Sequence, residues 1–278
     1  MPIDKYDPLR FVSLKGRLVP DRAAAGTQKG NVMSDAGKAA GMELPPDYDP
    51  EFRPIFEAAR HATMTSSSRM YALYKAVRYV VAAGIPGDFV ECGTWMGGSI
   101  MVMALTLRQC GVEDRFIHAY DTFEGMPPPT AVDMDVTGAS AASLLAGANA
   151  DDSASVWCRA GIDAVRANLD LTGYPSERFR LIQGMVEKTI PDKAPDRIAL
   201  LRLDTDWYAS TRHELEQLYP RLSPEGVLII DDYGHWQGAR RAVDEYFGPS
   251  LPLLLNRVDY TGRIAVKPLA HGFQAGGV

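Results

Sequence analysis

The chain has 278 residues, of which 46% are hydrophobic and 23% charged, and its net charge is -6. This length fits one large α/β domain with appendages. The mild negative charge and the lack of a basic run argue against nucleic-acid binding, because phosphate backbones attract clustered lysine and arginine side chains.

The N-terminus carries charges without the apolar core of a signal peptide, and no stretch approaches the roughly 18 apolar residues that span a bilayer. Cys92, Cys110 and Cys158 are widely spaced and form no CxxC pair. This pattern predicts reduced, buried thiols in a cytoplasmic protein and argues against a zinc or iron–sulfur site.

The first 50 residues mix Gly, Ala, Lys, Asp and Pro without periodicity and end in PPDYDP. We interpret residues 1–50 as an N-terminal arm that is partly mobile or draped on a partner subunit, which favours a homo-oligomer. The catalytic domain is expected over 51–270, followed by a C-terminal tail at 271–278.

Two helices are expected next. The first covers about 51–61, and the second carries apolar residues from Met70 to Val81 at helical spacing and is stopped by Gly84 and Pro86. Between them, TMTSSSR offers hydroxyls and Arg69 to a methionine carboxylate. Ser66 or Ser67 could equally serve as a helix N-cap.

The stretch GDFVECGTWMGGS at 87–99 reads as strand, glycine-bearing turn and helix start, the opening unit of a doubly wound α/β sheet. Further strands are expected at 116–123, 178–184, 198–203 and 227–230. The end of the chain, RVDYTGRIAVKP, predicts two antiparallel strands around a Thr-Gly turn.

Helices are expected between these strands. One holds Val156, Ile162, Val165 and Leu169, and another covers about 238–247. Thr211 and Glu214 have the spacing of a capping box and predict a crossover helix there. The stretch 126–155 is long, rich in small residues and weakly periodic, so we interpret it as a lid-like insertion, with a merely flexible insertion as the alternative.

Two acidic clusters, LRLDTDWY and VLIIDDYGHW, each follow an apolar run. The carboxyl ends of parallel strands share one edge of the sheet, so the carboxylates of Asp204, Asp206, Asp231 and Asp232 could converge there. Such convergence indicates a divalent metal site or acid/base chemistry, whereas a single Asp would more often cap a helix. An all-oxygen ligand set suits magnesium, manganese or calcium better than zinc.

Trp207, Tyr208, Tyr233 and Trp236 flank these clusters. They could stack on a sugar or an aglycone, but we expect at least two of them to pack in the core. His235 lies four residues beyond Asp231 and is a second candidate proton acceptor beside Asp206.

The glycine turn contains Gly93, Gly97 and Gly98, which do not have GxGxxG spacing, and it lacks a phosphate-loop lysine. Glu91 stands before it and would attract a cationic group. Asp121 ends the next strand, where an acidic side chain can accept hydrogen bonds from a ribose diol. A nucleoside with a cationic tail, such as S-adenosylmethionine, satisfies both positions.

Several stretches together carry a family resemblance: IPGD, ECGTWMGGS, AYDTFEGMPPP, LRLDTDWYAST and LIIDDYGHWQGARRAV. From about Met64 to Pro268 the chain resembles the macrocin O-methyltransferase (TylF/MycF) family. These enzymes use S-adenosylmethionine and a metal to methylate sugar hydroxyls on macrolides and other glycosylated natural products. The resemblance implies a Rossmann-like, seven-stranded sheet of the class I methyltransferase type with an antiparallel C-terminal hairpin.

The resemblance also implies roles for individual residues. Asp204, Asp231 and Asp232 match metal-ligand positions, and Asp206 matches a general-base position. Met96 and Thr205 depart from the family, which often has Arg and Gly at these places. The full donor-binding set that we expect is Met64, Thr65, Glu91, Gly93, Thr94, Ser99, Asp121 and Gly184.

The sequence therefore predicts an O-methyltransferase that depends on S-adenosylmethionine and a divalent cation, Mg²⁺ or else Mn²⁺ or Ca²⁺, and acts on a sugar hydroxyl of a small molecule. A non-sugar hydroxyl is the alternative acceptor. A nicotinamide-dependent oxidoreductase is disfavoured by the glycine pattern, and a metal-dependent phosphoesterase would not need Glu91 and Asp121. The expected partners are the small-molecule acceptor and further copies of this chain, whereas neither nucleic acid nor a membrane is expected.

Overall fold

The computed structural model describes residues 44–152, 155–248 and 253–269. Residues 1–43 of the predicted arm and the predicted tail at 271–278 lie outside these ranges. The end of the predicted arm is packed on the domain, since Leu44 is buried and the ring of Tyr48 stacks on Tyr71 at 3.9 Å. The packed domain thus begins before residue 51.

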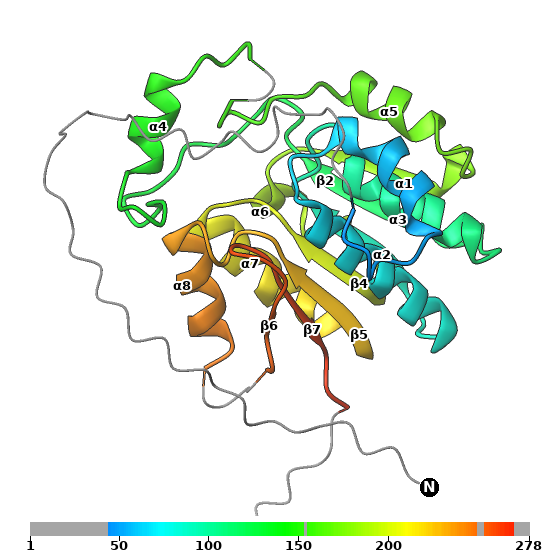
Figure 1. Ribbon diagram of the computed structural model, residues 1–278. Helices are drawn as coiled ribbons and strands as arrows, with labels where there is room; N and C mark the ends of the chain where they lie inside the picture. Colours follow the sequence, from blue (N-terminus) through cyan, green and yellow to red (C-terminus); the bar gives the residue numbers. More distant parts are fainter. Residues whose placement is uncertain (1–43, 153–154, 249–252, 270–278) are drawn as a thin grey trace, which may run out of the picture. The chain divides into compact units, whose positions relative to one another are not determined.

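The domain is built on one seven-stranded sheet in the order β3-β2-β1-β4-β5-β7-β6 (Figure 1). The first five strands run parallel, and β7 pairs antiparallel with both β5 and β6. This confirms the expected doubly wound sheet with an antiparallel C-terminal hairpin. The strands are β1 Asp88–Cys92, β2 Ile117–Asp121, β3 Phe179–Gln183, β4 Ile198–Leu203, β5 Leu222–Ile230, β6 Asn256–Arg257 and β7 Arg263–Val266.

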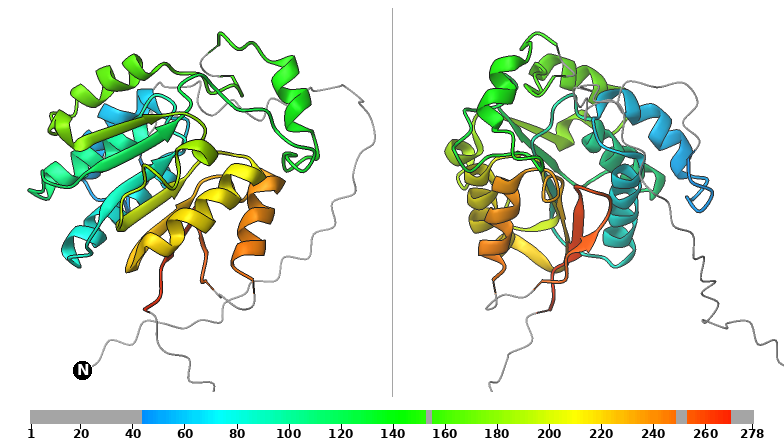
Figure 2. Two further views of the ribbon diagram at one scale, coloured as in Figure 1. Left: turned by 180° about the vertical axis from the view of Figure 1, so that it is seen from behind. Right: turned by 60° about the vertical axis from the view of Figure 1, so that its left-hand side comes forward.

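Helices cover both faces of the sheet, with α1, α2 and α3 on one face and α6, α7 and α8 on the other (Figure 2). Strand residues alternate between these layers: Phe89 packs in the first core and Val90 in the second. Within the described ranges, every helix is too short or too polar to cross a bilayer. The helices are α1 Phe52–Ala59, α2 Ser67–Ala82, α3 Gly98–Gln109, α4 Ala141–Gly147, α5 Ile162–Asp170, α6 Val186–Thr189, α7 Tyr208–Leu218 and α8 Gln237–Tyr246, with 3₁₀ turns at Arg60–Ala62, Ser176–Arg178 and Tyr219–Arg221.

The topology fixes where a ligand can bind. β1 lies at the centre, with β2 on one side and β4 on the other, so the strand order reverses between β1 and β4. In open α/β sheets, ligands bind outside the carboxyl ends of the strands at such a reversal. The glycine turn after β1 and both acidic clusters lie at this edge.

Two helix predictions were wrong in detail. The capping box at Thr211 and Glu214 is not the start of α7, because α7 begins at Tyr208 and both residues are buried inside it. Glu214 instead accepts a hydrogen bond from Thr205 Oγ1 at 3.0 Å. Val156 lies outside α5 and packs with Trp207 and Trp236 instead.

The insertion at 126–155 has structure of its own. It contains α4, and Ala141 and Leu145 of this helix are buried with Trp207 and Trp236 in a small apolar cluster. The described part of this stretch is therefore packed on the domain. Its opening as a lid stays a prediction.

Candidate active site

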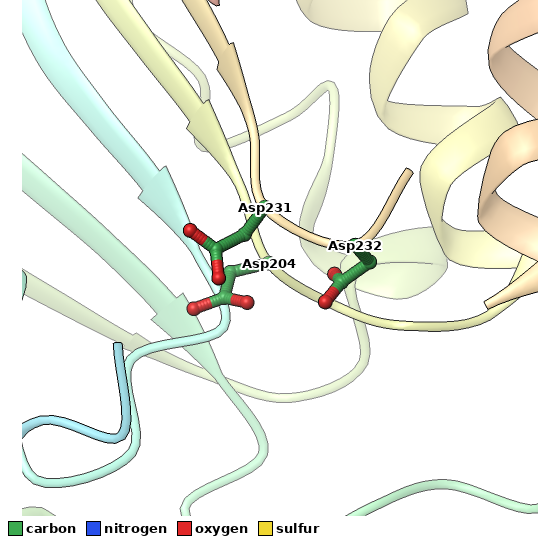
Figure 3. Close-up of side chains that lie close together, drawn as sticks. All are labelled: Asp204, Asp231 and Asp232. Atoms are coloured by element: carbon green, nitrogen blue, oxygen red, sulfur yellow. The ribbon is translucent and has the colours of Figure 1, made fainter. Parts of the chain in front are cut away.

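Three aspartates converge at the carboxyl ends of β4 and β5. Asp204 follows β4 directly, and Asp231 and Asp232 follow β5. One carboxylate oxygen from each residue lies within 4.8 Å of the other two (Figure 3). The sequence predicted that carboxylates following these two apolar strands would converge at this edge of the sheet. A set of three carboxylates suits a hard divalent cation.

These carboxylates are crowded as well as buried. Burial raises the pKa of Asp204 and Asp232 well above the usual range, and the negative charges of their neighbours act in the same direction. Asp231 Oδ1 is buried and accepts no hydrogen bond from the described residues, although Arg202 Nη2 lies 2.8 Å away. A cation between the oxygens would relieve this repulsion.

Two arginines that the sequence analysis did not place in the cluster partly neutralise it. Arg202 of β4 is only 3% exposed, and its two Nη atoms lie 2.6 Å from Glu91 Oε1 and 2.7 Å from Asp204 Oδ2. Arg69 of α2 pairs with Asp231 and, at 3.0 Å, with Asp259 Oδ2. The signal for Arg202 was present in the sequence, since it is the one charge in the apolar run IALLRL.

Arg69 therefore lies at the aspartate cluster rather than free for a methionine carboxylate. Its own backbone N–H donates to Ser66 Oγ at 3.2 Å, which makes Ser66 the N-cap of α2. Carboxylates still outnumber guanidinium groups around the two arginines, and this excess of negative charge favours a bound cation.

Asp206 lies beside the cluster in a strained turn. Its φ of +65° is in the left-handed region, and its backbone N–H donates to Asp232 Oδ2 at 3.1 Å. Burial raises the pKa of Asp206 to about 7, opposed by a side-chain hydrogen bond with Asp232. A carboxyl group with such a pKa is suited to accept a proton near neutral pH.

His235 lies three residues after Asp232, in the turn that follows β5. Its backbone N–H donates to the carbonyl oxygen of Asp232 at 3.0 Å, and its ring lies 4.9 Å from Trp236 and 6.0 Å from Tyr260. Burial lowers the pKa of His235, so the neutral ring is favoured. Its Nδ1 is buried without a hydrogen-bond partner in the described parts of the chain.

The glycine turn is organised by Asp121 at the end of β2. Asp121 Oδ2 accepts hydrogen bonds from the backbone N–H groups of Thr94, at 2.6 Å, and Trp95, at 3.1 Å, while Oδ1 accepts one from Phe123 at 2.7 Å. Each carboxylate oxygen has two lone pairs, and both of those on Oδ2 are used. Capacity for a ribose hydroxyl remains on Oδ1, because the nearby Thr122 hydroxyl, 3.5 Å away, donates to the Gly125 carbonyl oxygen at 2.6 Å.

Gly93 joins this turn to the metal side. Its φ is +83°, and a Cβ at this position would overlap the backbone carbonyl of Asp204. Only glycine allows this close approach. The donor-side turn and the first candidate metal ligand are thus in direct backbone contact.

The remaining predicted donor residues are distributed around this turn. Glu91 is fully buried, and burial raises its pKa to about 7, although Arg202 lowers it. Its Oε2 and Thr94 Oγ1 are buried without a hydrogen-bond partner in the described structure. Ser99 is buried at the start of α3, Gly184 follows β3 with a φ of +135°, and Met64 and Thr65 follow Ala62 and Thr63, which pack on Gly98.

Cys158 is close to the cluster, which the sequence analysis did not predict. Burial raises the pKa of its thiol, and the next causes are the negative charges of Asp206, Asp204 and Asp232. All three cysteines are free, as expected, but only Cys92 is fully buried. Trp207 and Trp236 are buried, as expected for core packing.

Known proteins are similar to this chain in sequence. The macrocin-O-methyltransferase (TylF) family matches residues 53–264. The 8-demethyl-8-(2,3-dimethoxy-alpha-L-rhamnosyl)-tetracenomycin-C 4'-O-methyltransferase of Streptomyces olivaceus is 36% identical over 224 residues, which cover 78% of this chain and 80% of that protein. Mycinamicin III 3''-O-methyltransferase of Micromonospora griseorubida is 33% identical over 184 residues, 66% of this chain and 69% of that protein.

Solved structures of methyltransferases have a similar fold. The O-methyltransferase NovP superposes with a TM-score of 0.65 at 29% identity, covering 75% of this chain and 83% of that chain. The calicheamicin methyltransferase CalS11 shares the fold, with a TM-score of 0.54 at 18% identity over 84% of this chain and 99% of that chain. The chain therefore belongs to the macrocin-O-methyltransferase (TylF) family and is an O-methyltransferase.

Proposed function

We propose that this enzyme transfers a methyl group from S-adenosylmethionine to a sugar hydroxyl of a glycosylated small molecule, with a divalent cation at Asp204, Asp231 and Asp232. The observation that carries the proposal is the convergence of these three carboxylates within 4.8 Å, next to a glycine turn in contact with Asp204. The tetracenomycin and mycinamicin relatives support it, because their names describe O-methylation of a rhamnosyl compound and of mycinamicin III.

Two buried polar atoms near the glycine turn after β1 are available to bind S-adenosylmethionine. Glu91 Oε2 and Thr94 Oγ1 are buried and unpaired within the described residues, so they could accept from and donate to a bound polar ligand. Glu91 would attract the cationic part of the donor, and Asp121 would accept from its ribose. When bound, the donor supplies a methyl group on a positively charged sulfur.

The three carboxylates of Asp204, Asp231 and Asp232 offer the oxygen ligands that Mg²⁺ or a similar ion prefers. Such an ion stabilises the negative charge that develops on a hydroxyl oxygen. Arg202 and Arg69 hold the ligand carboxylates of Asp204 and Asp231 in place. Asp206 would accept the proton that the hydroxyl loses, with His235 as the alternative acceptor.

An open groove of about 690 Å³ lies between residues 131–136 and the outer face of α8. Its lining includes His235 but none of the four aspartates after β4 and β5, so it could hold the remote part of the acceptor rather than the reacting hydroxyl. This volume is within the range of small-molecule sites, which is roughly 300 to 1,000 Å³. Its lining mixes apolar, aromatic and charged side chains, among them Val132, Met134, Tyr233, His235, Trp236 and Arg240.

The test is a methyl-transfer assay that measures S-adenosylhomocysteine release with three kinds of acceptor: an aryl rhamnoside, a free sugar and a catechol. We expect turnover with the glycoside in Mg²⁺, loss of turnover in EDTA, and recovery when Mg²⁺ is restored. Asp231→Ala should be inactive. Asp163→Asn changes an exposed carboxylate on α5 and serves as the matched control.

Two results would contradict parts of the proposal. Turnover that is insensitive to both EDTA and Asp231→Ala would remove the metal from the mechanism. Methylation of the catechol in preference to both sugars would replace the sugar acceptor by a non-sugar hydroxyl. Family membership leaves no support for the oxidoreductase or phosphoesterase alternatives.

A further inference from the structure

The segment 127–135, which follows β2, contacts both acid-bearing turns, and we refer to it as the brace. On the β4 side, Trp207 Nε1 donates to the carbonyl oxygen of Pro127 at 2.9 Å. The backbone N–H of Tyr208 donates to Asp133 Oδ1 at 2.8 Å. Trp207 and Tyr208 are the two residues after Asp206, so the brace holds the turn that carries the expected base.

On the β5 side, the brace binds the start of α8. The backbone N–H of Gln237 donates to the carbonyl oxygen of Met134 at 2.8 Å, and its Nε2 donates to that of Asp135 at 2.8 Å. Asp135 also forms a β-bridge with Trp236. Trp236 also belongs to the turn that follows Asp232, since its backbone N–H donates to the carbonyl oxygen of Asp232 at 3.0 Å.

Asp133 is the centre of the brace and is fully buried. Its Oδ2 accepts hydrogen bonds from the backbone N–H and the hydroxyl of Thr130, both at 2.7 Å. Its Oδ1 caps the first turn of α7, whose own N-cap residue Trp207 makes no side-chain cap. Gly238 leaves the space for this carboxylate, because a Cβ there would overlap Asp133 Oδ1.

The two acidic turns need such support because the sheet ends before them. The β4–β5 pairing ends at Leu203 and Ile230, one residue short of Asp204 and Asp231. Beyond that point, the hydrogen bonds from Asp231 N–H to the Leu203 carbonyl oxygen and from Asp206 N–H to Asp232 Oδ2 join the two turns. The separation of Asp206 from the Asp231 and Asp232 pair otherwise depends on loop conformation. The ring pair Trp207 and Trp236, 4.9 Å apart beneath the brace, is held by the same contacts.

We infer that the brace sets the spacing between Asp206 and the two aspartates after β5, and that Asp133 is therefore a positioning residue for the base and the cation ligands. Asp133 acts through Tyr208 and the start of α7, not by contact with the acceptor. This inference rests on the proposed function, since it concerns the cation site named there.

The experiment is titration of the full-length protein with Mn²⁺ by calorimetry, together with acceptor and donor kinetics. Asp133→Asn keeps the volume but presents an N–H group to Thr130 where an acceptor is needed. Gly238→Ala displaces the carboxylate without removing it. We expect both to weaken Mn²⁺ binding by about 10- to 100-fold, as for groups that support metal ligands, and to lower acceptor kcat/KM while leaving the KM for S-adenosylmethionine unchanged.

Asp163→Asn should match the wild type in every readout. If Asp133→Asn or Gly238→Ala does not fold, Thr130→Val removes one hydrogen bond to Asp133 and should give a smaller change in the same direction. If the folded variants bind Mn²⁺ as tightly as the wild type, the positioning role of the brace is overturned while the cation site stands. If the wild type binds no Mn²⁺, the proposed cation site is wrong. In that case, an unchanged acceptor kcat/KM in the variants would overturn the positioning role of the brace as well.

Discussion

At the scale of single residues, the site depends on two arginines, the buried Arg202 and the partly exposed Arg69, as much as on its aspartates. Isolated buried carboxylates lose their hydration and repel one another, so they need compensating cations. Arg202 compensates Glu91, Asp204 and Asp231 from within β4, and Arg69 compensates Asp231 from α2. The aspartates were predicted from their place after apolar runs, and Arg202 stood out as the one charge in such a run. Its pairing with Glu91 and Asp231, and that of Arg69 with Asp231, join residues distant in sequence and were not predictable.

Asp232→Asn separates function from stability. The substitution removes a proposed cation ligand and a buried carboxyl group next to Asp206 and Asp231, while an Asn oxygen can still accept the backbone N–H of Asp206. We expect turnover to fall by about 100-fold or more, while the Tm without metal stays equal or rises because repulsion is relieved. Calorimetric unfolding and the methyl-transfer assay measure the two effects; a large loss of Tm would contradict this account.

Asp259→Asn tests the link between α2 and the hairpin of β6 and β7. Asp259 accepts hydrogen bonds from Ser66, Arg69, Thr261 and Gly262, and these bonds lower its pKa against the effect of burial. Because a charged hydrogen-bond acceptor is lost, we expect the variant to be less stable by about 1 to 3 kcal/mol at pH 7.

The sign of the pH dependence follows from that pKa. A carboxylate whose pKa is lowered by folding stabilises the native state above its unfolded value of 3.8, and this contribution is lost as pH falls through the folded value. The stability difference between Asp259→Asn and wild type should therefore shrink below pH 3.8. Urea unfolding at several pH values measures it, and a difference independent of pH would exclude the charge as its source.

At the scale of elements, the turn between β1 and α3 is tightly constrained by a close backbone contact. Gly93→Ala adds a Cβ that overlaps the Asp204 carbonyl in a left-handed conformation. We expect destabilisation of about 2 to 4 kcal/mol from overlap and backbone strain together. Gly111→Ala is the control, because Gly111 also has a positive φ but its Cβ would meet no atom.

Gly111→Ala should lower the free energy of unfolding by only about 1 to 2 kcal/mol, because it adds backbone strain without steric overlap. Denaturant unfolding of both variants provides the comparison. Equal losses would show that the contact with Asp204 is unimportant.

The start of α7 shows why one element was misplaced. Thr211 and Glu214 have capping-box spacing, yet both are buried inside the helix. The cap comes from Asp133, 75 residues earlier in the chain. Local spacing cannot report a cap that a distant segment provides.

At the scale of the whole molecule, seven strands bring the donor turn after β1 and the acidic turns after β4 and β5 to one edge. A ligand that binds there should stabilise the entire domain, because the site is formed only when the sheet is folded. The homo-oligomer expected from the N-terminal arm stays a prediction, to be checked by light scattering.

Mg²⁺ should therefore raise the Tm of the wild type. At a hundredfold excess over Kd the gain is about 2.7 kcal/mol, or roughly 5 to 10 °C. Differential scanning calorimetry with and without EDTA measures it, and Asp232→Asn should show no rise. An equal rise in Asp232→Asn would place the ion elsewhere.

The sequence by itself determined the order of the strands along the chain, the helices other than α4 and α6, the sites of both acidic clusters and the family, because apolar runs, glycine turns and short motifs are local signals. The tertiary structure alone decided which carboxylates share Arg202, that Gly93 touches Asp204, and that residues 127–135 hold two turns from different strands. These contacts join residues far apart in the chain, and only packing determines them.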